Sequence, residues 1–145
     1  MAAVVSTLFG VGIAGASRQA GAAAGTVVVT IEGFRGAAGH ARVAVFNREA
    51  GFPDDESASY RKLVAEIKDG RVEVRFEGLP YGDYAVSMYH DANDDAKVNK
   101  GWFGIPQEGY GVSNNIVHAT RGPRFGEALF RLAEQVHEVN IRVHY

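Results

Sequence analysis

Residues 71–78 alternate between charged and apolar side chains, and this pattern constrains the fold more than any other feature of the chain. The apolar positions are Val72, Val74 and Phe76, and each lies between arginine or glutamate residues. Successive side chains of a β-strand point to opposite faces, so a strand here has one apolar and one charged face. The segment therefore predicts a strand of an antiparallel sheet that is buried on one face and solvated on the other.

Six further segments have the β-branched residues, aromatic residues or alternation that indicate strands. They are residues 26–34, 41–47, 60–68, 83–90, 127–133 and 138–145. In the last of them, the inward positions are expected to be Val139, Ile141, Val143 and Tyr145. Residues 127–133 also contain good helix formers, so a helix remains an alternative to a strand there.

Turn signals separate most of these segments. Residues 36–39 are expected to form a hairpin loop, and Asp69-Gly70 is a strong hairpin signal. Residues 78–82 contain Pro80 between two glycines, which also predicts a turn. About seven short strands separated by turns predict an all-β fold, a single antiparallel β-sandwich of immunoglobulin-like or transthyretin-like type with one long loop.

Residues 2–15 are uncharged and mostly apolar, and small residues follow them. This pattern is typical of a secretory signal peptide, and Ala-x-Ala cleavage patterns occur at residues 14–16 and 22–24. We therefore expect a leader over residues 1–24, a β-sandwich domain over residues 25–145 and a periplasmic or secreted location. A disordered alanine-rich leader is the alternative. The apolar run is shorter than the ~20 residues of a membrane-spanning helix, so no transmembrane span is expected in the mature chain.

Residues 91–126 contain no predicted strand, and long irregular segments of compact domains are frequently functional. Oxygen-bearing side chains occur there at alternate positions, the spacing with which a calcium-binding loop begins. In that spacing, Lys97 contributes its backbone carbonyl and Asn99 acts directly or through water. The metal-site residues are therefore expected to be Asp91, Asn93, Asp95, Lys97 and Asn99. The alternative is a polar loop whose Asp and Asn side chains cap its own turns.

A second candidate site in the same loop is a surface of aromatic residues among glycines. Exposed aromatic side chains are a common means of gripping sugars or peptides. The binding residues are expected to be Trp102, Phe103, Tyr110, Asn114 and Asn115, with an unidentified protein or glycan of the cell envelope as partner. Two alternatives remain: Trp102 and Phe103 fold back over one end of the sandwich, and residues 113–115 form only a turn.

The composition narrows the range of functions. A formal net charge of −2 argues against nucleic-acid binding through phosphate neutralisation. The chain has no cysteine, which excludes disulfides, thiolate metal sites and cysteine nucleophiles. His90, Asp91 and Ser113 form a nominal triad, but no Gly-x-Ser-x-Gly or His-Glu-x-x-His motif occurs, so enzymatic activity is not expected.

Three functional hypotheses follow from these features. The first is a binding or structural module outside the cytoplasm that presents residues 91–126 to its partner. The second is a calcium-stabilised structural domain without a recognition surface, and the third, least favoured, is a hydrolase that uses the same loop. No cofactor is expected apart from a weakly bound Ca²⁺.

Several phrases of the sequence, in order, resemble a bacterial family known only as domain of unknown function 2141. The longest are FEGLPYGDYAV at residues 76–86, YHDANDDAKVNK at 89–100, FGIPQEGYGVSNN at 103–115 and GPRFGEALF at 122–130. The resemblance extends over nearly all of the expected mature chain. It implies an exported protein with a transthyretin-like sandwich. Because the family has no assigned activity, the resemblance does not point to any particular one.

The resemblance also bears on the candidate calcium loop. Members of the family typically have Asp-x-Asn-x-Asn-Gly-Lys-x-Asp here, whereas this chain has Ala96 in place of the glycine and Asn99 in place of the last aspartate. Trp102 occupies the position at which a bidentate glutamate completes a calcium loop. These departures imply weak binding.

Overall fold

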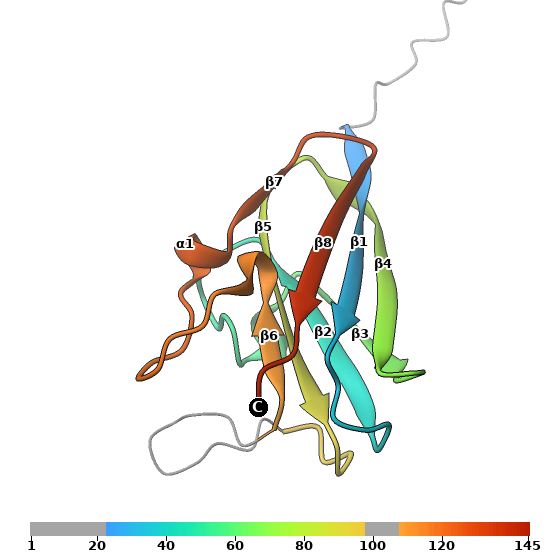
Figure 1. Cartoon of the computed structure of the whole chain (residues 1–145). Helices are drawn as coiled ribbons and strands as arrows, with labels where there is room; N and C mark the ends of the chain where they lie inside the picture. Colours follow the sequence, from blue (N-terminus) through green and yellow to red (C-terminus); the bar gives the residue numbers. More distant parts are fainter. Residues whose placement is uncertain (1–22, 98–107) are drawn as a thin grey trace, which may run out of the picture.

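The computed structural model describes residues 23–97 and 108–145, which form two packed β-sheets (Figure 1). The three-stranded sheet has the order β4-β1-β8, and the five-stranded sheet has the order β3-β2-β5-β6 with β7 also paired to β5. The strands are β1 Ala24–Glu32, β2 His40–Phe46, β3 Arg61–Glu66, β4 Arg71–Pro80, β5 Gly82–Asp91, β6 Tyr110–Val112, β7 Phe130–Leu132 and β8 Val136–Arg142. The predicted all-β sandwich is confirmed, with eight strands in the described residues rather than about seven.

Three short helical elements complete the described secondary structure. They are η1 Glu56–Ala58, η2 Ser113–Asn115 and α1 Phe125–Ala128. In the part of the chain that the structure describes, no helix combines the length and apolar character that a membrane crossing requires. Of the predicted leader, only residues 23 and 24 lie within the described residues.

The alternating segment forms β4 as predicted, with Val72, Val74 and Phe76 buried in the core between the sheets. In β8 and just beyond it, Val139, Ile141 and Val143 are buried as predicted. The prediction for Tyr145 is wrong, since this residue is 41% exposed. β8 ends at Arg142, and the chain then turns to pair with β6, so the strand alternation does not continue to the last residue.

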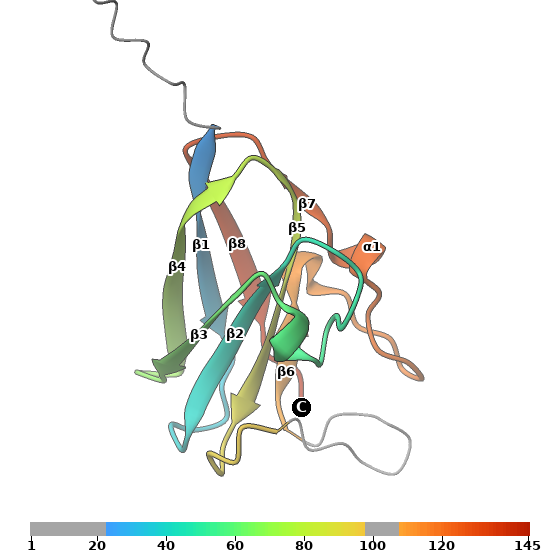
Figure 2. The same cartoon turned by 180° about the vertical axis from the view of Figure 1, so that it is seen from behind.

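Two predicted hairpins join strands of different sheets (Figure 2). Residues 36–39 connect β1 to β2, which do not pair, so the hairpin prediction is wrong there. At Asp69-Gly70 the tight turn does form, because Lys68 and Arg71 exchange both backbone hydrogen bonds and the two central residues have positive φ. Beyond that turn, β3 and β4 separate into the two sheets. One pairing also departs from the antiparallel pattern, since β1 and β8 run parallel.

β5 is buried on both faces from Tyr84 to Asp91. Its inner face contributes Tyr84, Val86 and Met88 to the core, as the sequence predicts. On the outer face, Ala85 belongs to a second hydrophobic cluster, most of whose residues follow β5 in the sequence. That second cluster contains Val112 and Ala128, with Phe52, Ile116 and Phe125 packed against it.

Residues 91–126 are less irregular than predicted, because β6 and η2 form within them. β6 has only three residues, and its pairing with β5 is long-range, so no local signal marks it. A Cβ on Gly111 would lie 2.5 Å from Ile141 Cγ2, which explains why a strand-disfavouring glycine stands in the middle of β6. Residues 127–133 contain both predicted states, the end of α1 and then β7.

Candidate metal centre

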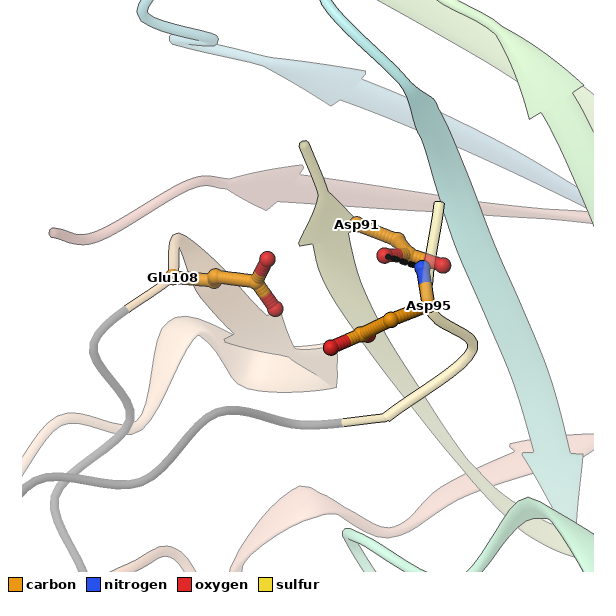
Figure 3. A group of neighbouring side chains, drawn as sticks. All are labelled: Asp91, Asp95 and Glu108. Carbon is orange, nitrogen blue, oxygen red and sulfur yellow. Dashed lines mark hydrogen bonds between the residues drawn. The ribbon is translucent and has the colours of Figure 1, made fainter. Parts of the chain in front are cut away.

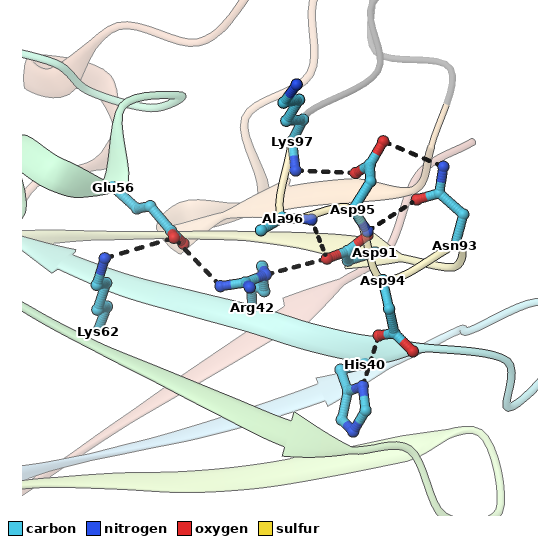
Figure 4. Close-up of polar contacts among 10 residues, drawn as sticks. All are labelled: His40, Arg42, Glu56, Lys62, Asp91, Asn93, Asp94, Asp95, Ala96 and Lys97. Carbon is cyan, nitrogen blue, oxygen red and sulfur yellow. Dashed lines mark hydrogen bonds and ion pairs between the residues drawn. The ribbon is translucent and has the colours of Figure 1, made fainter.

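Asp91 is the last residue of β5, and it is only 1% exposed. Its Oδ2 accepts hydrogen bonds from Arg42 Nε and from the Ala96 backbone N–H, each at 3.0 Å. Its Oδ1 accepts a hydrogen bond from the Asp95 backbone N–H at 3.1 Å. A buried carboxylate is tolerated only when it is paired and hydrogen-bonded, and Asp91 has both kinds of partner (Figure 4).

Arg42, on the neighbouring strand β2, links Asp91 to a second carboxylate. Its Nη1 donates to Glu56 Oε1 at 3.2 Å, and Lys62 Nζ lies 3.5 Å from the same oxygen (Figure 4). Burial acts to lower the pKa of Arg42, but its hydrogen bond to Asp91 and the charge of Glu56 raise that pKa overall. The guanidinium therefore stays charged and holds the Asp91 side chain against the sheet.

The loop after Asp91 is held by hydrogen bonds from its own side chains. Asp95 Oδ1 accepts from the Lys97 backbone N–H at 2.9 Å, and Asp95 Oδ2 accepts from Asn93 Nδ2 at 3.1 Å. These are the contacts of a polar loop that caps its own turns. Within the described contacts, Asn93 and Lys97 serve this turn.

Asp94 fastens the same loop to β2. Its Oδ1 lies 2.6 Å from His40 Nδ1, and this hydrogen bond, with the charge of Asp94, raises the pKa of the exposed His40. Because the folded-state pKa is the higher one, the pair contributes stability below the ordinary histidine pKa. That contribution is lost as the pH rises through the raised pKa.

Ala96 has a φ of 60°, a left-handed conformation that glycine adopts without steric strain. We expect Ala96→Gly to raise the free energy of unfolding by roughly 0.5–1 kcal/mol, after the larger entropy of glycine in the unfolded state is taken into account. Urea unfolding measures the change. Ala92→Gly is the control, because Ala92 is exposed and its φ is not positive, and it should give no gain. A loss of stability in Ala96→Gly would contradict the assigned conformation.

Glu108 enters the site from the far end of the loop, and sequence analysis did not identify it. The backbone carbonyl of the next residue, Gly109, accepts from the His90 N–H at 2.7 Å. A Cβ on Gly109 would lie 2.5 Å from Val143 Cγ1 and 2.6 Å from the Tyr145 ring, so only glycine fits. This close approach positions Glu108 beside the end of β5. It depends on the pairing of β5 with β6, and no residue spacing encodes that pairing.

Asp91, Asp95 and Glu108 each offer one carboxylate oxygen, and these oxygens lie within 4.8 Å of one another (Figure 3). Oxygen ligands lie about 2.3–2.6 Å from a bound Ca²⁺, so ligands on opposite sides of one ion are roughly 5 Å apart. Among the described residues, Glu108 Oε2 is buried and has no hydrogen-bond partner. A buried carboxylate oxygen without a partner is unfavourable, and a cation between the three groups would satisfy it.

The acidic groups also affect a neighbouring phenol. Burial raises the pKa of Tyr89, on β5, to about 12, and the charges of Glu56, Asp91 and Glu108 add to the rise while Arg42 opposes it. Three carboxylates and one guanidinium therefore act on this phenol from around the end of β5.

The five predicted metal-site residues therefore do not all have the same role. Asp91 and Asp95 belong to the carboxylate cluster, Asn93 and Lys97 take part in the turn, and Asn99 lies outside the described residues.

Of the predicted binding residues, Trp102 and Phe103 also lie outside the described residues. Tyr110 is half-buried in β6, with its ring centroid 6.3 Å from that of His144. Asn114 Nδ2 donates to the carbonyls of Glu127 and Leu129.

Asn115 has a structural role of the same kind. Its Nδ2 donates to the Asn140 carbonyl, and its Oδ1 accepts from the Arg142 N–H. The amides of Asn114 and Asn115 therefore fasten η2 to its neighbours, as the turn interpretation of residues 113–115 implies.

The members of the nominal triad are engaged separately. The ring nitrogens of His90 contact the Tyr145 hydroxyl at 2.8 Å and the Ala38 carbonyl at 2.7 Å. The Ser113 hydroxyl donates to the Ala128 carbonyl and accepts from the Val86 N–H. Neither the described bonds of His90 nor those of Ser113 include the other residue or Asp91.

Comparison with known proteins places the chain in a family. A family model described as an uncharacterized protein conserved in bacteria (DUF2141) matches residues 29–140. No curated protein and no solved structure matches the chain. The matched range contains most of the sandwich and all three carboxylates of the candidate metal centre. The chain is therefore a member of the bacterial DUF2141 family.

Proposed function

We propose that this protein is a non-enzymatic binding or structural module in which a divalent cation, Ca²⁺ by preference, joins the two ends of the loop after β5. Asp91 and Asp95 would bind the ion from the beginning of the loop, and Glu108 would bind it from the end. The segment between them contains Trp102 and Phe103, the aromatic residues expected to contact a protein or glycan partner. Cation binding would then hold the two ends of this segment together.

The observation that carries the proposal is the Glu108 carboxylate. Its Oε2 is buried and lacks a hydrogen-bond partner among the described residues, while one oxygen of Asp91 and one of Asp95 lie within 4.8 Å of a Glu108 oxygen. Figure 3 shows Glu108 projecting toward the other two side chains from the segment before β6. Three carboxylates in this arrangement repel one another unless positive charge lies between them.

The donor atoms favour calcium over softer metals. All three ligands are carboxylate oxygens, which suit hard cations, and Ca²⁺ accepts irregular geometry more readily than Mg²⁺. Asp91 has already used part of its accepting capacity on Arg42 and on two backbone N–H groups. We therefore expect a dissociation constant of about 10⁻⁴–10⁻³ M, the range of extracellular calcium modules. Such an affinity suits the periplasmic or secreted location that we propose.

Thermal unfolding with EDTA and with added Ca²⁺ tests the proposal. Free calcium at roughly 100 times its dissociation constant stabilises a native state by about 2.7 kcal/mol, which corresponds to roughly 10 °C for a domain of this size. The shift should vanish in Glu108→Gln, which keeps the shape of the side chain and removes its charge.

Glu138→Gln is the matched control for that experiment. It makes the same chemical change at an exposed carboxylate of β8, outside the cluster, and should keep the full calcium shift. Equal midpoints of the wild type in EDTA and in 10 mM calcium would contradict the proposal.

A further inference from the structure

β3 forms one edge of the five-stranded sheet (Figure 2). By the burial of its residues, it is the most exposed strand of the described sandwich. Every residue of β3 except Ala65 is exposed. Val64 is 53% exposed and Leu63 is 38% exposed, both in the middle of the strand. An edge strand presents unpaired backbone N–H and C=O groups, and exposed apolar side chains at its centre favour pairing with another strand.

On the side of the sandwich opposite β3, hydrogen bonds join the two sheets and occupy the strand edge. There Tyr110 of β6 exchanges backbone hydrogen bonds with His144, so the two sheets are joined. The Asn115 amide also occupies the edge of β8, where it bonds with backbone groups of Asn140 and Arg142. On the β3 side, beyond the two backbone bonds between Lys68 and Arg71 in the turn, Arg61 Nη1 donates to the Glu77 carbonyl. An open hollow of about 460 Å³ near that turn is lined by residues of both β3 and β4.

The charges of β3 are complementary to those of a second, antiparallel β3. Arg61 and Lys62 stand at the beginning of the strand, and Glu66 stands at its end. Two antiparallel copies therefore place the basic end of each strand against the acidic end of the other. Opposite charges directly across a strand pair stabilise the pairing, and like charges destabilise it.

Symmetry and charge together select one register. A two-fold axis perpendicular to a continuous sheet pairs residues on the same face, so it must pass through a residue of β3. An axis at Leu63 would place Lys62 opposite Val64, and an axis at Ala65 would place Lys62 opposite Lys68. An axis at Val64 places Val64 opposite its own copy, Leu63 opposite Ala65, and Lys62 opposite Glu66 on both sides. Of these three registers, only the last matches apolar residues with apolar residues and also places both outer-face charges, Lys62 and Glu66, opposite a charge of the other sign.

We propose that β3 pairs antiparallel with β3 of a second copy of this chain, about a two-fold axis at Val64, so that the two five-stranded sheets become continuous. The interface uses the outer-face side chains of Lys62, Val64 and Glu66. It does not involve the carboxylates of the candidate metal centre, so the two proposals can fail independently.

The oligomeric state of charge variants tests this pairing, with sedimentation analysis as the measurement. The wild type should be a dimer. Lys62→Glu or Glu66→Lys alone places like charges opposite each other at two symmetry-related positions and should weaken the dimer by roughly tenfold to a hundredfold. The double variant Lys62→Glu with Glu66→Lys restores opposite charges and should restore the dimer. A wild type that remains monomeric at 1 mM, or a double variant no better than the single variants, would overturn the proposal.

A single introduced cysteine tests the register itself. Because the chain has no native cysteine, Val64→Cys can form a disulfide only with its copy, and directly opposed residues of a strand pair are close enough for one. Under mild oxidation we expect Val64→Cys to form covalent dimers much faster than Val136→Cys, a similarly exposed position in β8. Equal cross-linking rates of the two variants would show random collision and would rule out the register.

Discussion

Asp91→Ala is expected to lower the free energy of unfolding by about 3–5 kcal/mol, whether or not calcium is present. The substitution removes the acceptor of three donors: the Arg42 guanidinium and the backbone N–H groups of Asp95 and Ala96. The Arg42 side chain, only 20% exposed, would lose its buried partner and keep only the ion pair with Glu56. Urea unfolding in EDTA measures the loss.

Asp94→Asn is the control for this experiment, because it removes the charge of a carboxylate in the same loop whose described partner, His40, is exposed, and asparagine tolerates the positive φ at this position. Exposed ion pairs contribute about 1 kcal/mol or less, so the control should lose little stability. If Asp91→Ala lost no more stability than Asp94→Asn, the role of Asp91 as an organising residue would be wrong. The expected size of the Asp91 effect also makes Glu108 the better position for testing metal binding.

Phe46→Ala is expected to lower the free energy of unfolding by about 3–5 kcal/mol as well, the usual loss for truncating a buried phenylalanine. Phe46, at the end of β2, is fully buried. Its ring centroid lies 5.3 Å from that of Phe52, which in turn lies 5.7 Å from that of Phe125. The substitution would therefore open a cavity beneath the layer that covers the outer face of the five-stranded sheet.

Urea unfolding of Phe46→Ala and of Val117→Ala measures this effect. Val117 follows Ile116, a residue of the outer cluster, but is itself 45% exposed, so its truncation should change stability by less than about 0.5 kcal/mol. A small effect of Phe46→Ala would mean that the outer layer is loosely packed and does not fix the position of β6 and of the loop end.

Local sequence patterns correctly predicted individual strands and one tight turn. The alternation at residues 71–78 identifies β4 and its buried face, and the Asp69-Gly70 turn forms as its residues require. Which strands pair depends on the whole chain. The hairpin prediction at residues 36–39 therefore failed, because β1 finds its partners in β4 and β8 rather than in β2.

The outer layer explains a second group of differences. Strand prediction from alternation assumes one buried and one solvated face, but Phe52, Ile116 and Phe125 cover the second face of the five-stranded sheet around Ala85 of β5. This layer is built from short elements far apart in the sequence, such as β6 and α1, whose stability comes from tertiary packing.

Two of the three carboxylates of the candidate metal centre were predicted from the sequence, and the third was not, because its position depends on tertiary structure. The alternate spacing of Asp91 and Asp95 indicates a ligand-bearing loop, and both residues belong to the cluster. Glu108 reaches them only because β6 returns beside β5 and Gly109 permits a close approach.

The central claim is that Asp91, Asp95 and Glu108 share one cation, and a calcium titration followed by ¹H–¹⁵N NMR tests it most directly. We predict saturable shifts, with a dissociation constant of about 10⁻⁴–10⁻³ M, that are largest for the amides of residues 91–97 and 108–110 and that disappear in Glu108→Gln. Signals in those two segments that remain unchanged at 10 mM calcium, or that move equally in Glu108→Gln, would contradict the account.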